Sequence, residues 1–71
     1  MREFFDVMYR DYCEGLKELT ALRNNNIERL RRARLDSDHE LADDLSQTLV
    51  IQNEEIAEMR EAVRQIETAA D

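Results

Sequence analysis

Residues 42–66 read ADDLSQTLVIQNEEIAEMREAVRQI, and this stretch decides the fold because its apolar residues recur at alternating gaps of three and four. Such spacing is the heptad pattern of helices that pack along one side. The eight seam positions are Ala42, Leu45, Leu49, Gln52, Ile56, Met59, Val63 and Ile66. Seven of them are apolar, so the stretch predicts an amphipathic helix that requires a partner helix.

The first half of the chain supplies a second helix of the same kind. Its stripe consists of Phe5, Met8, Tyr12, Leu19 and Leu22, with Leu16 beside it and Leu30 continuing it. The three asparagines at positions 24–26 are poor helix formers, but the apolar spacing resumes after them without a change of phase. We therefore expect one continuous helix, with Gly15 as a weaker point of it.

A joint between the two helices is predicted at residues 35–37. Ser37 and Glu40 match the capping-box pattern, in which the serine hydroxyl accepts from the backbone amide three residues later and the glutamate reaches back. We expect helix 1 over about residues 2–35, a turn over about 35–37, and helix 2 over about 38–69. Together they form a single helical-hairpin domain, residues 1–71.

A short turn makes the two helices antiparallel neighbours, so the register can be predicted. With the turn centred near position 36, residue i should lie near residue 72 − i. This rule pairs apolar with apolar along most of the seam, for example Leu16 with Ile56. It also places Asn26 near Ser46 and Leu19 near Gln52, which gives two polar interruptions of the type that specify register.

The fold class is therefore all-α, an antiparallel helical hairpin with a coiled-coil-like seam. Phe4, Val7, Val50 and Ile51 are apolar residues that fall outside that seam. A two-helix hairpin of 71 residues buries little surface against the entropy of ordering the chain. We expect these four residues to mediate self-association, so that two hairpins form a homodimeric four-helix bundle; the alternative is a long monomeric hairpin.

Charge is divided unevenly along the chain. The net charge of −7 combines eight Lys/Arg and six Asp/Glu in residues 1–35 with two arginines and eleven acids in residues 36–71. The acidic second half would repel a polyanion, which argues against general nucleic-acid binding and favours a basic protein partner. The predicted partner-binding acidic face comprises Asp43, Asp44, Glu54, Glu58, Glu61 and Glu67.

The end of the hairpin near the turn offers an alternative function. Arginines 23, 29, 31, 32 and 34 lie close to the asparagines at 24–26 and to His39, the single histidine, so nucleic-acid or metal binding there is the competing hypothesis. Against it, acids across the turn are placed to neutralise the arginines, and we expect an intramolecular charge network.

Signs of chemistry are lacking in this sequence. It has no pairing of nucleophile and base and no phosphate-binding loop, and Cys13 has no histidine near it in the sequence. We expect a non-enzymatic interaction module, an adaptor, regulator or inhibitor, with no catalytic residues, no cofactor and no metal. The N-terminal residues predict no secretory signal and no stretch predicts a membrane span, so a cytoplasmic location is expected.

Overall fold

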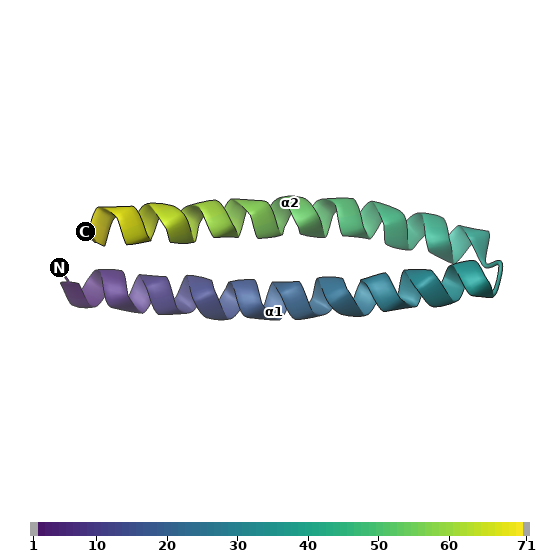
Figure 1. The fold of residues 1–71 in the computed structure, drawn as a ribbon, viewed down its shortest axis with the longest axis horizontal. Coiled ribbons are helices and arrows are strands. Elements are labelled where there is room, and N and C mark those ends of the chain that lie inside the picture. Colours follow the sequence, from purple (N-terminus) through teal and green to yellow (C-terminus); the bar gives the residue numbers. More distant parts are fainter. Residues whose placement is uncertain (1, 71) are drawn as a thin grey trace.

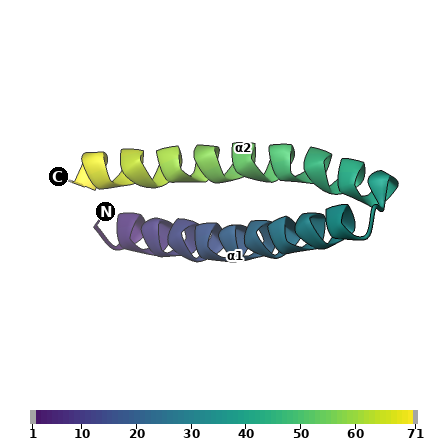
Figure 2. The same ribbon diagram turned by 45° about the vertical axis from the view of Figure 1, so that its right-hand side comes forward.

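The computed structural model describes residues 2–70, with side chains from 4 to 69. Two helices, α1 (Arg2–Leu35) and α2 (His39–Ala70), lie antiparallel and side by side along their full length (Figures 1 and 2). The rod measures 53 × 14 × 13 Å, and the first turn of α1 lies beside the last turn of α2, at the end opposite the connecting turn. The all-helical hairpin predicted from the heptad pattern is confirmed.

Helix α1 runs without interruption through the asparagine run. Asn24 and Asn26 use their side-chain oxygens to accept from Arg23 Nε at 3.2 Å and Arg29 Nη1 at 3.1 Å, respectively. Because these amide groups bond to neighbouring side chains, they do not compete for the backbone hydrogen bonds of the helix. The prediction of one continuous helix is confirmed.

The turn is built differently from the predicted capping box. Ser37 has a φ of 58°, the left-handed conformation that glycine most often supplies after a helix. Its amide donates to the Arg34 carbonyl at 3.2 Å, and the next amide, of Asp38, donates to the Ala33 carbonyl at 2.8 Å. These two bonds form a Schellman motif, so Ser37 ends α1 and does not cap α2.

Asp38 is the residue that caps α2. Its Oδ1 accepts from the Leu41 amide at 3.2 Å, and its carbonyl accepts from the Ala42 amide at 2.9 Å. A carboxylate here satisfies an otherwise unpaired amide and interacts favourably with the positive end of the helix dipole. The predicted capping role of Ser37 is wrong because Asp38 occupies the N-cap position of α2, one residue later, while Ser37 belongs to the turn that ends α1.

The tightest packing lies next to the turn. Leu30, Ala33 and Leu45 are buried there, and Ala42 and Leu49 pack against them. Two alanines in one cluster let the helix axes approach closely at this end. We call these five residues the tip cluster; Ala33 was not among the expected seam residues.

Farther from the turn, burial is confined to single side chains of α2. Ile56 is only 1% exposed, and Ile66 is also buried. Gly15 contributes from the other helix, because a Cβ built on it would lie 2.9 Å from Met59 Cε. The missing side chain makes room for the methionine, so Gly15 is a packing position and not merely a weak point of α1.

The seam on α1 departs from the predicted stripe after Leu19. Leu22 is 58% exposed, whereas Arg23 and Asn26 are half-buried and bond across to α2. Positions 19, 26 and 33 keep the seven-residue repeat, and the position between them moves by one residue, to Arg23 and Leu30. The expected seam position of Leu22 is therefore wrong.

The register also differs from 72 − i. Because α1 ends at Leu35 and α2 begins at His39, the turn centres on Ser37 and residue i faces about 74 − i. The contact between Gly15 and Met59 follows this rule. Asn26 bonds Gln52 and not Ser46, whose hydroxyl donates to its own helix at the Ala42 carbonyl. Gln52 was expected beside Leu19.

Candidate functional site

Four of the six predicted acidic-face residues point away from α1. Ile56 faces α1, and a residue two positions away is rotated by roughly 200°, so Glu54 and Glu58 lie on the opposite side of α2. Glu61 continues this side one turn later, and Asp43 joins it because about five full turns separate it from Glu61. All four are exposed. We call them the outer acidic face.

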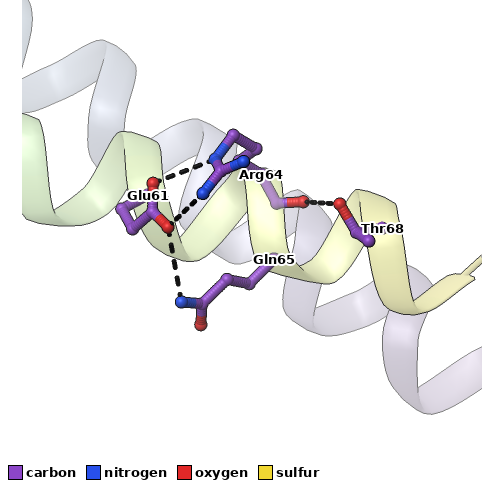
Figure 3. Close-up of polar contacts among 4 residues, drawn as sticks. All are labelled: Glu61, Arg64, Gln65 and Thr68. Atoms are coloured by element: carbon purple, nitrogen blue, oxygen red, sulfur yellow. Dashed lines mark hydrogen bonds and ion pairs between the residues drawn. The ribbon is translucent and has the colours of Figure 1, made fainter.

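Glu61 differs from the rest of that face because it already has a cationic partner. Figure 3 shows Arg64 donating to both of its carboxylate oxygens, at 2.6 and 3.0 Å, with Gln65 at 3.5 Å. The arginine lowers the pKa of Glu61, and the carboxylate raises the pKa of Arg64. Thr68 donates to the Arg64 carbonyl at 2.9 Å. Glu61 is thus partly neutralised, whereas Glu54 and Glu58 form no ion pair among residues 4–69.

The remaining two predicted residues lie elsewhere on α2. Glu67 is six residues beyond Glu61, about 240° around the helix, and it accepts a hydrogen bond from the Tyr9 hydroxyl at 3.0 Å. That bond, followed by contact with Cys13, raises the pKa of Tyr9 to about 12. Asp44 is rotated by roughly 100° from Asp43 but lies about 40° from Glu58, so it borders the outer acidic face. The structure therefore does not bring all six acids onto one surface.

The sequence predicted polar interruptions at Asn26 and Gln52 but not the way in which polar residues pair across the middle of the seam. Arg23 Nη1 donates to Asn53 Oδ1 at 3.2 Å, and Asn26 Nδ2 donates to Gln52 Oε1 at 3.1 Å. We call these four residues the polar bridge. Gln52 is a seam position and Asn53 points about 100° away from it, so the bond of Arg23 lies on one flank of the seam. Asn26 and Gln52 were both expected as polar interruptions of the seam, whereas the apolar spacing did not select Arg23 or Asn53.

The charge network expected across the turn does not form. Two ion pairs are found among residues 4–69, and neither crosses the turn. Arg31 pairs with Glu28 at 3.4 Å within α1, and Arg64 pairs with Glu61 at 2.6 Å within α2. Charged side chains on the outer sides of α1 and α2 point away from each other. The arginines at the end of α1 and the acids at the start of α2 are therefore close in sequence but form no ion pairs with each other among residues 4–69. The expected neutralisation of the arginines is therefore wrong.

The competing metal site gains no geometric support. His39 is exposed on the first turn of α2, and within the described part of the chain no group of three or more His, Cys, Asp or Glu side chains is placed to hold a metal ion. Cys13 is half-buried beside Tyr9. Neither residue is brought next to a partner that would give it a chemical role.

The residues predicted to mediate self-association are all exposed but do not share a surface. Phe4 and Val7 are 64% and 57% exposed and line a hollow with Met8, Asp11, Tyr12 and Met59. Val50 and Ile51 are 59% and 55% exposed, yet as consecutive residues they point about 100° apart. Val50 lies one turn before Asn53, on the Arg23 flank of the seam.

Neither described helix contains an apolar stretch of the length and hydropathy that a membrane span requires. No protein-family model matches the chain, and no curated protein or solved structure matches it either. Function must therefore be argued from the surfaces described above.

Proposed function

We propose that this protein is a non-enzymatic protein–protein interaction module that presents the outer acidic face of α2 to a basic surface of a partner protein. The observation that carries the proposal is the position of Glu54 and Glu58. Both are exposed on the side of α2 opposite α1, and no arginine or lysine among residues 4–69 forms an ion pair with them.

Two properties of the hairpin support this role. Residues 36–71 carry eleven acids and only two arginines, so the field around α2 is negative and accelerates the approach of a basic surface. The acids also lie on a helix that packs against α1 along its length, so their spacing is held constant. A preformed array of charges loses little conformational entropy when it binds.

We further propose that two hairpins associate into a four-helix bundle. The support is the exposed apolar surface of a thin rod: beyond Phe4 and Val7, Leu22 and Leu35 are exposed on α1 at 58% and 79%. One seam with few fully buried side chains leaves a small hydrophobic contribution to offset chain entropy, and a second interface would add to it.

The acidic-face proposal is tested by comparing three forms of the protein as bait in a native extract. The Glu54→Lys plus Glu58→Lys variant reverses the outer acidic face. The matched control, Asp6→Lys plus Asp36→Lys, changes the net charge equally but lies on α1 and the turn. We expect basic proteins to be recovered by the wild type and the control and lost from the Glu54/Glu58 variant, with association slowed by added salt.

Equal recovery of the same proteins by all three forms would contradict the acidic-face proposal. Recovery of nucleic acid in its place, lost when Arg31, Arg32 and Arg34 are changed to glutamine, would favour the arginine-rich end of α1 instead. Binding there should weaken steeply with salt because phosphate contacts release counterions.

A further inference from the structure

Helix α1 carries a second lengthwise stripe, about a quarter turn away from the seam. Phe4 and Leu22 lie on the same side of the helix because about five full turns separate them. Consecutive hollows mark this side: one whose lining includes Phe4, Val7 and Asp11, one lined by Glu18, Ala21, Leu22 and Asn25, and one whose lining includes Asn25, Glu28, Arg29, Arg32 and Leu35. We call this surface the outer stripe of α1.

Charges on the outer stripe are sorted by sign along the helix. The section before Ala21 holds Asp11, Glu14 and Glu18, and the section after it holds Arg29 and Arg32. All five are exposed, and none of them forms an ion pair within residues 4–69. Glu28 also lines the last hollow, but Arg31 pairs with it at 3.4 Å. The stripe therefore presents an acidic section and a basic section on either side of a small apolar centre.

Such a stripe is complementary to a reversed copy of itself. A two-fold axis near Ala21 and Leu22 places a second α1 antiparallel to the first. The arginines of each copy then lie opposite the acids of the other copy. The same rotation places Phe4 and Val7 near Leu35 of the other copy, so exposed apolar residues meet at both ends. A two-fold interface requires this self-complementarity.

We infer that the occupant of the outer stripe is a second copy of this chain, with two α1 helices packed antiparallel about Leu22. This inference rests on the proposed self-association and specifies the surface that performs it. A parallel pair would oppose like charges, which is unfavourable. Packing α1 on the partner's α2 would give the acids of the outer stripe few cationic partners. Helix α2 holds two arginines, and one of them, Arg64, already bonds Glu61.

Two charge-reversal variants of the full chain test the arrangement by sedimentation equilibrium. The acid-reversed variant carries Asp11→Lys, Glu14→Lys and Glu18→Lys, and the base-reversed variant carries Arg29→Glu and Arg32→Glu. Each stripe then has one sign, so we expect each variant alone to dimerise at least about tenfold more weakly than the wild type. An equimolar mixture should form a one-to-one heterodimer, which also shows that both variants fold.

The Glu54→Lys plus Glu58→Lys variant is the matched control, and we expect it to dimerise like the wild type. Wild-type protein that stays monomeric at high micromolar concentration would overturn both the self-association and this inference. A wild-type dimer that neither reversal weakens, or that the acid-reversed variant strengthens, would overturn the inference alone. Partner capture through the outer acidic face is a separate measurement, so its failure would leave the dimer result intact.

Discussion

The tip cluster and the polar bridge occupy neighbouring sections of one seam and are built from opposite chemistry. Near the turn, Leu30, Ala33 and Leu45 exclude water, with Ala42 and Leu49 packed against them. Two to three helical turns farther along, the same two helix faces meet through an arginine and three amide side chains, joined by hydrogen bonds of 3.1 and 3.2 Å.

This difference separates stability from specificity. Apolar burial is non-directional, so the tip cluster stabilises contact between the helices but discriminates weakly between neighbouring registers. Hydrogen bonds between specific polar side chains form in one register and are lost in others, at some expense of stability. We expect substitutions in the tip cluster to change mainly the free energy of unfolding, and substitutions in the polar bridge to change mainly the alignment of the helices.

The largest effect is expected from Leu45→Ala. Removing a buried leucine side chain loses its transfer free energy and leaves a cavity, which costs roughly 2–4 kcal/mol. For a hairpin this small, that is most of the free energy of unfolding, and urea denaturation followed by circular dichroism should show a much lower midpoint. Ile51→Ala is the control and should change the midpoint little, because Ile51 is 55% exposed and lies outside the outer stripe of α1.

Breaking one bond of the polar bridge should have a smaller effect. Gln52→Leu leaves the half-buried Asn26 amide without its partner, which costs on the order of 1–2 kcal/mol. Adding Asn26→Leu should recover most of that loss, since two apolar side chains then face each other. A double-mutant cycle measures the coupling, and additive effects would show that the bond does not contribute.

The turn provides a third comparison, between Asp38, which caps α2, and Ser37, which ends α1. Asp38→Ala removes the side chain that caps the Leu41 amide and should lower the free energy of unfolding by about 1 kcal/mol. Thermal denaturation compares this variant with Asp36→Ala, which removes a neighbouring carboxylate that makes no capping bond. Equal losses in the two would contradict the assignment of Asp38 as the cap.

Ser37→Gly should raise the free energy of unfolding by roughly 0.5–1 kcal/mol. Glycine adopts a φ of 58° without the steric cost that a Cβ introduces, and this gain outweighs its greater freedom in the unfolded chain. Thermal denaturation should show a higher midpoint. A lower midpoint would indicate that the serine hydroxyl contributes to the turn, contrary to the Schellman geometry.

The smallest effect concerns pH at the end of the hairpin opposite the turn. Because the bond to Glu67 raises the pKa of Tyr9 from 10.0 to about 12, the folded state holds this proton more tightly than the unfolded state. The associated stability is fully present below pH 10 and is lost as pH rises to about 12. Phenolate absorbance in a Tyr12→Phe background should show the high midpoint, and Glu67→Gln should lower it.

The sequence predicted the elements of this fold better than their alignment. Heptad spacing in residues 42–66 identified α2, and the polar segment at 35–38 located the joint, because both patterns reflect local preferences of the chain. The register was misjudged because Ser37 resembles an N-cap in sequence, and its left-handed conformation follows from the Schellman bonds formed by the whole turn.

The surfaces were predicted in part for a related reason. Exposure of Phe4, Val7, Val50 and Ile51 follows from their positions outside the heptad, but the direction in which each points depends on the helical phase. The place of Arg23 in the seam was not predicted, because the apolar spacing selects its neighbour Leu22. A long side chain that bonds across the seam through its end group leaves no apolar signal in the sequence.

The position of the tip cluster has a consequence for how the hairpin folds. Ala33 and Ala42 flank the turn closely, so bringing them together closes a short loop at little entropic cost, whereas contacts near Phe5 and Ile66 close nearly the whole chain. We expect the seam to form first at the turn and then to propagate toward the chain ends. The hydrogen bonds of the polar bridge then form only after the turn has aligned the two helices. At that stage they stabilise the register that the turn has already set.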